Sequence, residues 1–130
     1  WALAERRDLE PLLAAADIVS LHVPLTEATR AMIDERRIGL MRPDAVLLNA
    51  ARGGVVDEAA LAKALRAGRL GGAALDVFAD EPLSASGAAM FIGCPNLILT
   101  PHIAGVTQES NGRVSSLIAA RILDVLGGRA

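Results

Sequence analysis

Histidine, arginine and acidic side chains lie at the ends of four short apolar runs, and these residue types move protons and bind anions. His22, Arg52, Asp76 and His102 lie at or just beyond the end of one run each, and Glu81 follows the third run. If the runs are parallel strands, their carboxyl ends meet at one edge of a sheet, where open α/β sheets bind ligands. The spacing therefore predicts one candidate active site built from these five residues.

The chemistry of these side chains suits acid–base catalysis and carboxylate binding. His102 is a candidate acid/base, because an acidic side chain on a neighbouring strand can support it near neutral pH. Arg52 precedes Gly53–Gly54, where the backbone can approach a ligand, and its guanidinium matches a carboxylate. Asp76 lies in an apolar run, so it must be hydrogen-bonded if it is buried. The structural alternatives are a local carbonyl partner for His102 and a surface ion pair for Arg52, and for His22 the structural interpretation is preferred.

Composition excludes several other classes of function. Cys94 is the single cysteine, so no internal disulfide can form. No base is evident beside it in the sequence, so we expect a small apolar loop residue and not a nucleophile. No group of histidines and carboxylates has metal-site spacing. Lys plus Arg is 13, Asp plus Glu is 15 and aromatic residues make up 2%, which argues against nucleic-acid binding. No apolar run approaches the length of a bilayer span, so we expect no membrane partner. The absence of targeting signals and disulfides favours a cytoplasmic location.

The elements that must position these residues alternate along the chain. The four runs, predicted to be strands buried on both faces of a sheet, are 17–23, 45–49, 72–78 and 96–100. Helical patterns lie beside them: 9–16 after Asp8, a region up to Met41 after Thr26 or Asp34, 58–67 after Asp57 and before Gly68, and a last helix from Thr107 or Ser110 to 127–128. The segment 79–95 shows no pattern, which predicts a long loop. Alternation of strand and helix predicts a single α/β domain with a parallel sheet.

Four motifs carry a resemblance to a known family. Residues 17–26, 50–58, 74–82 and 99–105 resemble the D-isomer-specific 2-hydroxyacid dehydrogenases, which include phosphoglycerate, glycerate and D-lactate dehydrogenases, and the motifs occur in the family's order and spacing. The resemblance implies a Rossmann-like three-layer NAD-binding domain. It also implies an oxidoreductase that transfers hydride between NAD, or NADP, and a D-2-hydroxy acid or 2-oxo acid, commonly as a homodimer. Residues 105–115 are similar to the corresponding segment of sulfolactate dehydrogenases.

The resemblance further implies a role for particular residues. Arg52 would bind the substrate carboxylate, His102 would exchange a proton with the C2 oxygen, and Glu81 would pair with His102 and favour its imidazolium form. Asp76 would hydrogen-bond the nicotinamide carboxamide. In such enzymes the cofactor carries the hydride chemistry and the protein supplies orientation and charge. The residues expected to line the cofactor are Val23, Pro24, Ala50, Ala51, Arg52, Asp76, His102, Ile103, Ala104 and Gly105.

One part of the family pattern is missing from the sequence. The Gly-x-Gly-x-x-Gly turn, and the acidic residue about 20 positions later that binds the ribose, would precede residues 17–23. Neither is present, Gly53–Gly54 and Gly71–Gly72 do not fit the turn, and the chain begins at Trp1. We therefore expect residues 1–130 to be the second half of an NAD-binding domain, without the substrate domain. On that basis the chain alone binds NAD weakly or not at all and does not turn over.

The sequence also allows three other interpretations of the protein's function. A non-catalytic binding module similar to the C-terminal-binding corepressors would bind NAD and assemble partners while keeping Arg52, Glu81 and His102, and peptide binding without turnover would identify it. A formate dehydrogenase-like enzyme would carry Gln in place of Glu81, which counts against it. A structural half-domain would leave apolar surface and strand edges exposed, and its folded and oligomeric state would identify it.

Overall fold

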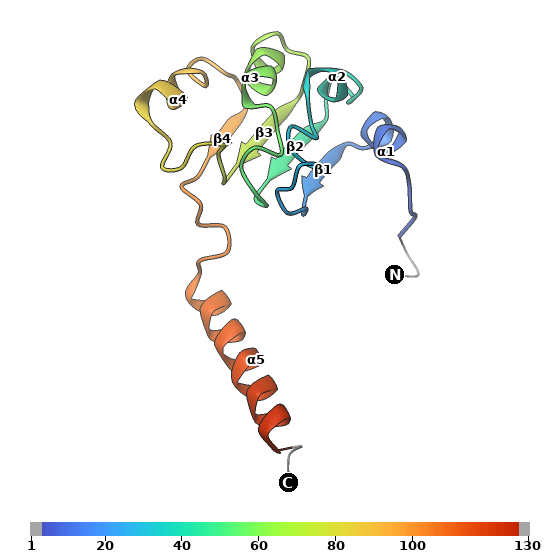
Figure 1. Ribbon diagram of the computed structural model, residues 1–130. Coiled ribbons are helices and arrows are strands. Elements are labelled where there is room, and N and C mark those ends of the chain that lie inside the picture. The colour runs from blue at the N-terminus through green and yellow to red at the C-terminus, as the bar shows by residue number, and fades with distance from the viewer. Residues whose placement is uncertain (1–3, 128–130) are drawn as a thin grey trace.

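A four-stranded parallel sheet organises the chain, and the computed structural model describes residues 4–127 of it (Figure 1). The strands lie in the order in which they occur in the sequence, and each pairs in parallel with the next. The α/β class with a parallel sheet is thus confirmed, and each observed strand falls within a predicted run. The strands are β1 (Ile18–Leu21), β2 (Val46–Asn49), β3 (Gly72–Leu75) and β4 (Leu97–Leu99).

Helices alternate with the strands, and side-chain caps fix several of their first turns. Asp34 accepts a hydrogen bond from the Arg37 amide and Asp57 accepts one from the Ala60 amide, as N-cap residues do. Thr107, rather than Ser110, caps the last helix, because its hydroxyl accepts from the Ser110 amide at 3.0 Å. The helices are α1 (Leu9–Ala15), α2 (Glu35–Ile38), α3 (Glu58–Arg66), α4 (Ala85–Ala89) and α5 (Gln108–Gly127).

Three predictions about local structure are wrong. Residues 27–31 form turns rather than a helix, since the Thr26 and Thr29 hydroxyls bond to each other and to nearby backbone. The segment 79–95 contains α4, whose first turn is capped by Ser84; its sequence of small residues has no apolar periodicity that would predict a helix. Asp8 precedes α1 but makes no side-chain capping bond.

The core lies between the sheet and one layer of helices. Figure 1 shows α2, α3 and α4 along one side of the sheet, with α1 beside the edge strand β1. Burial alternates along β1, and the opposite face of the sheet is open, where Ile18 is 64% and Ile98 is 65% exposed. In the described residues the helices lie along one side of the sheet, and the prediction of strands buried on both faces is wrong for the outer strands β1 and β4. Fully buried core side chains include Leu13, Ile33, Leu47, Val55, Leu61, Leu65 and Leu75.

Helix α5 differs from the others because it extends away from the sheet (Figure 1). None of its 20 residues is buried. It follows β4 through the segment that carries His102. Apolar side chains at helical spacing, among them Leu117, Ile118 and Ile122, are more than half exposed. Across residues 4–127, no helix combines the length and apolarity needed to span a bilayer.

Candidate active site

The candidate residues meet at the carboxyl edge of the sheet, as the spacing predicts. His22 follows β1, Arg52 follows β2, Asp76 follows β3 and His102 follows β4, and all four strands point the same way. The residues divide into two groups along this edge. One group surrounds His102 beyond β3 and β4, and the other surrounds Arg52 beyond β1 and β2.

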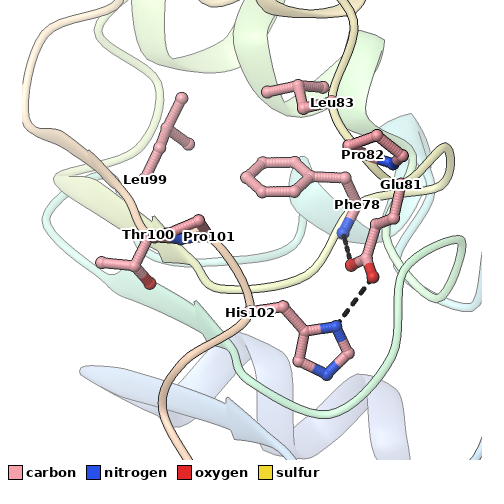
Figure 2. Close-up of a pocket in the computed structure, with 8 residues that line it drawn as sticks. All are labelled: Phe78, Glu81, Pro82, Leu83, Leu99, Thr100, Pro101 and His102. Carbon is pink, nitrogen blue, oxygen red and sulfur yellow. Dashed lines mark hydrogen bonds and ion pairs between the residues drawn. The ribbon is translucent and has the colours of Figure 1, made fainter.

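His102 and Glu81 form a hydrogen-bonded pair (Figure 2). The Nδ1 atom of His102 lies 2.7 Å from Oε2 of Glu81, and the other Glu81 oxygen accepts the Phe78 amide at 2.9 Å. The bond from His102, reinforced by the Phe78 amide against the effect of burial, lowers the pKa of Glu81 below its ordinary value. His102 has a backbone φ of 56°, a left-handed conformation that is uncommon for a residue other than glycine. Such conformations persist where surrounding contacts hold them, which is frequent at active sites.

This pairing defines the chemistry open to the imidazole. An ionised carboxylate only accepts hydrogen bonds, so the Nδ1 atom of His102 carries the hydrogen in the pair. The Nε2 atom then remains available to give or take a proton. Figure 2 shows Nε2 directed away from Leu83 and Leu99. The arrangement matches an acid/base histidine that is oriented by a carboxylate.

A cavity of about 630 Å³ adjoins the pair. Figure 2 shows Leu83 and Leu99 at one end of it and His102 at the other, with the Phe78 ring between them. Mostly apolar walls with a few convergent polar groups are typical of small-molecule sites. The cavity is lined by Phe78, Glu81, Pro82, Leu83, Leu99, Thr100, Pro101 and His102.

Asp76 anchors the segment that carries His102. Its side chain is buried, with Oδ1 accepting from the Thr100 hydroxyl at 2.5 Å and the Ile103 amide at 2.8 Å. Its Oδ2 accepts from the Ala104 amide at 2.9 Å. Burial opposes ionisation of Asp76, but these bonds outweigh it and lower the pKa of its carboxyl. Sequence reasoning missed Thr100, although a polar residue at the end of an apolar run is the signal that would have found it.

Arg52 lies on a turn fixed by a buried asparagine. The Asn49 side chain donates to the Arg52 carbonyl at 3.0 Å and accepts from the Ala51 amide at 3.2 Å. The Arg52 guanidinium is exposed and donates to the Ala51 carbonyl at 2.6 Å. Within residues 4–127 it makes no ion pair, so the surface salt bridge weighed from the sequence is not found. Sequence reasoning also missed Asn49, which is the polar end of an otherwise apolar run.

Gly53 is required by packing within the protein. A Cβ atom at this position would lie 1.7 Å from the Phe78 carbonyl oxygen, so the loop after β2 touches the loop after β3 backbone to backbone. The expectation that this glycine admits a ligand is therefore corrected: its close neighbour is the chain itself.

The remaining candidates have structural explanations. His22 Nε2 lies 2.9 Å from the Ser20 hydroxyl, a local partner of the kind that the structural interpretation expects. Cys94 is half-buried and packs against the core. In the described part of the chain, no three histidine, cysteine or acidic side chains come together as a metal site would require.

The residues expected to line a dinucleotide are arranged to suit its nicotinamide end. Val23, Pro24, Ala50 and Ala51 line a shallow hollow together with His22 and Arg52. Asp76 has three donors for about four acceptor positions, which leaves one position for an amide. Ile103, Ala104 and Gly105 are exposed in the segment that Asp76 anchors. These features suit the nicotinamide end, whereas no Gly-x-Gly-x-x-Gly turn for the pyrophosphate occurs in the sequence.

Comparison with known proteins gives one consistent result. Residues 2–104 match the family model described as D-isomer specific 2-hydroxyacid dehydrogenase, NAD binding domain. The chain is 52% identical to the (S)-sulfolactate dehydrogenase of Chromohalobacter salexigens, in an alignment that covers 100% of this chain and 42% of that protein. It is 47% identical to the glyoxylate reductase of Thermofilum pendens, in an alignment that covers 95% of this chain and 36% of that protein.

Solved structures agree with this result. A D-isomer specific 2-hydroxyacid dehydrogenase from Lactobacillus delbrueckii ssp. bulgaricus, in its NAD-complexed form, superposes with a TM-score of 0.75 at 36% identity. The match covers 95% of this chain and 42% of that chain. The chain thus spans about two-fifths of the length of these relatives.

Proposed function

The chain belongs to the D-isomer-specific 2-hydroxyacid dehydrogenase family, and from this premise we propose that it forms part of an oxidoreductase acting on a 2-hydroxy acid with NAD or NADP. Residues 1–130 supply the second half of the NAD-binding domain in this proposal. The observation that carries it is the 2.7 Å contact between His102 and Glu81 at the carboxyl edge of the sheet. An oriented imidazole is the group that reduction of a carbonyl requires, because a proton must reach oxygen as hydride reaches carbon.

In the proposed mechanism each residue acts on one part of the substrate. The hydride would come from NADH when that cofactor is bound. The Arg52 guanidinium binds the carboxylate of the 2-oxo acid with two parallel N–H donors and so orients the reacting carbonyl. His102 gives the proton on Nε2 to the C2 oxygen during reduction and takes it back during oxidation. Glu81 holds Nδ1 and stabilises the positive charge on the imidazolium.

The cofactor would be held by residues from three strand ends. Asp76 would accept the carboxamide N–H of the nicotinamide and so select the ring face that meets the substrate. Val23, Pro24, Ala50 and Ala51 would contact the ring and its ribose, and Ile103, Ala104 and Gly105 would border it. This assignment is supported by the hollow beyond β1 and β2 and by the acceptor position left on Asp76.

The relatives narrow the choice of substrate to test first. We propose (S)-sulfolactate and its matching 2-oxo acid, because the sulfolactate relative is 52% identical over the whole chain. A homodimer is supported by the exposed apolar side chains of α5, which need a covering surface. A cytoplasmic location is supported by the single cysteine, since disulfide frameworks mark oxidising compartments.

The test is NADH consumption by the full-length protein that carries this chain, with a panel of 2-oxo acids that includes glyoxylate and the sulfolactate-derived acid. We expect turnover with at least one acid. Binding of NADH and of peptides without turnover of any acid would replace this proposal with the corepressor-like one. The Lys63→Ala variant is a control, because Lys63 is exposed on α3 and pairs with Glu35 outside the proposed site.

A further inference from the structure

Glu58 makes a contact that the proposed mechanism does not use. It lies in the first turn of α3, where its half-buried side chain accepts the Ala79 amide on Oε1 at 2.6 Å. Ala79 lies between Phe78 and Glu81, in the loop that delivers the carboxylate to His102. The contact therefore joins a helix on the face of the sheet to the loop behind the acid/base pair.

We propose that Glu58 is a positioning residue for the acid/base pair, acting through the Ala79 backbone on Glu81 and through Glu81 on His102. The inference rests on the proposed dehydrogenase function for its kinetic consequence, but its structural content concerns the loop alone. Glu58 touches none of the reacting atoms in this proposal.

Three contacts together fix the loop. The Phe78 carbonyl abuts Gly53, the Phe78 amide donates to Glu81, and the Ala79 amide donates to Glu58. The first holds Phe78 against the loop after β2, and the second joins Phe78 to the Glu81 side chain within the loop itself. Neither of them ties the loop to helix α3. The bond to Glu58 supplies that tie, one residue closer to Glu81 than Phe78. Arg52 precedes Gly53 directly, so the same contacts fix the arginine turn relative to the carboxylate.

Glu58 lies among other negative charges, which indicates that it is placed there to accept the hydrogen bond from the Ala79 amide. Burial raises the pKa of the Glu58 carboxyl, the Ala79 amide opposes that rise, and the nearby charges of Asp80, Asp57 and Glu81 add to it. A carboxylate among three others is electrostatically unfavourable, and a glutamine would accept the same bond without the charge. Ala79 is exposed, so its amide can turn to water when Glu58 is lost. Loss of Glu58 should therefore disturb loop geometry more than folding stability.

The experiment compares three substitutions of Glu58 in the full-length protein. Glu58→Ala removes the acceptor, Glu58→Asp keeps the charge but shortens the reach by one methylene, and Glu58→Gln keeps the reach and an acceptor oxygen without the charge. Glu35→Ala is the matched control, because Glu35 also lies in a first helical turn and forms an exposed ion pair with Lys63 at 2.7 Å. Each variant is measured for kcat, KM for NADH, thermal unfolding, and the His102 Nδ1–H proton resonance by NMR, assigned with His102→Ala.

We expect Glu58→Ala and Glu58→Asp to lower kcat by about tenfold to a hundredfold, since misplacing a catalytic group by about 1 Å costs about a hundredfold. KM for NADH and the unfolding temperature should stay close to wild type, the His102 resonance should weaken, and Glu58→Gln should recover most of the rate and the resonance. The proposal is overturned if Glu58→Ala leaves kcat and the resonance unchanged, or if Glu58→Gln is as impaired as Glu58→Ala. If Glu58→Ala does not fold, kcat and the His102 resonance are compared between Glu58→Gln and Glu58→Asp. The proposal is overturned if Glu58→Asp is at least as active as Glu58→Gln.

Failure of the positioning role and failure of the proposed function give different results. A wild-type protein that turns over no 2-oxo acid refutes the dehydrogenase proposal, while the His102 resonance in the Glu58 variants still decides whether Glu58 holds the pair. An active wild type whose Glu58 variants match Glu35→Ala in every measurement refutes only the positioning role.

Discussion

The two groups of side chains at the carboxyl edge differ in how firmly hydrogen bonds hold them in place. Beyond β3 and β4, His102, Glu81 and Asp76 are all engaged in hydrogen bonds that involve an ionised partner. Beyond β1 and β2, the exposed Arg52 guanidinium has a backbone carbonyl as its partner. The chain thus fixes the groups proposed to move a proton and leaves free donors on the group proposed to bind an anion.

This difference suits the role proposed for each group. Proton transfer depends on orientation, and orientation held before the substrate arrives costs nothing during the reaction. Anion binding requires donors that are not already satisfied, and a guanidinium has five N–H groups. Substitutions in the group around His102 should therefore lower kcat, whereas substitution of Arg52 should raise KM for the substrate.

The largest effect is expected from His102→Ala in the full-length protein. Removing the acid/base should lower kcat by about 10²–10⁴, the contribution of general acid–base catalysis. Affinity for NADH, measured by fluorescence titration, should change little. An unchanged kcat would show that the histidine is not the acid/base.

Arg52→Ala should affect the other side of the comparison. Losing charge-assisted bonds to the substrate carboxylate should raise KM for the 2-oxo acid by about tenfold to a hundredfold, given roughly 1.5–3 kcal/mol for bonds to charged groups. Affinity for NADH should fall much less. Equal loss for substrate and cofactor would mean that Arg52 supports the turn rather than the substrate.

Glu81→Gln should give a smaller loss than His102→Ala, because the imidazole remains while its carboxylate partner becomes a neutral amide. We expect kcat to fall by about tenfold, which is less than the 10²–10⁴ that acid–base catalysis supplies as a whole. Steady-state kinetics over a range of pH values would measure it. A loss as large as that of His102→Ala would mean that the pair acts as one unit.

Asp76→Asn should act on stability and reveal its pH dependence. An amide group in place of one oxygen leaves a buried donor unsatisfied, which costs about 1–3 kcal/mol. The pKa of Asp76 lies below its ordinary value of 3.8, so the ionised carboxylate stabilises the fold above about pH 4 and this stabilisation is lost as the pH falls through the folded-state pKa. Denaturant unfolding should show wild type and variant converging below about pH 4. A constant difference across pH would contradict the role of its charge.

The smallest signal is expected from residues 1–130 studied alone. The sequence holds no Gly-x-Gly-x-x-Gly turn, so we expect weak or undetectable NADH binding and no turnover by calorimetry and absorbance assays. Measurable dehydrogenase activity from these 130 residues would contradict this prediction.

The features that local sequence determines could be predicted. The strands, the capping roles of Asp34 and Asp57, and the placement of Arg52, Asp76 and His102 at one edge all follow from apolar runs and polar ends. Helix α4 could not, because small residues give no periodic signal. The partnerships of Thr100 with Asp76 and of Glu58 with Ala79 span 24 and 21 positions, so the tertiary fold creates them. The open face of the sheet was also missed, because apolar runs do not reveal whether a covering layer is present.

The sequential strand order has a consequence for assembly. Each new strand adds to the edge left by the previous one, so β1, β2 and β3 can pair as they leave the ribosome, while β4 joins last. Because β4 is a three-residue edge strand, it is also the first candidate for local opening from the native state. His102 follows β4, so fraying of this one strand would separate the proton donor from Glu81 while the rest of the sheet stays folded. Hydrogen exchange at β4 would then report, amide by amide, how often His102 and Glu81 are apart.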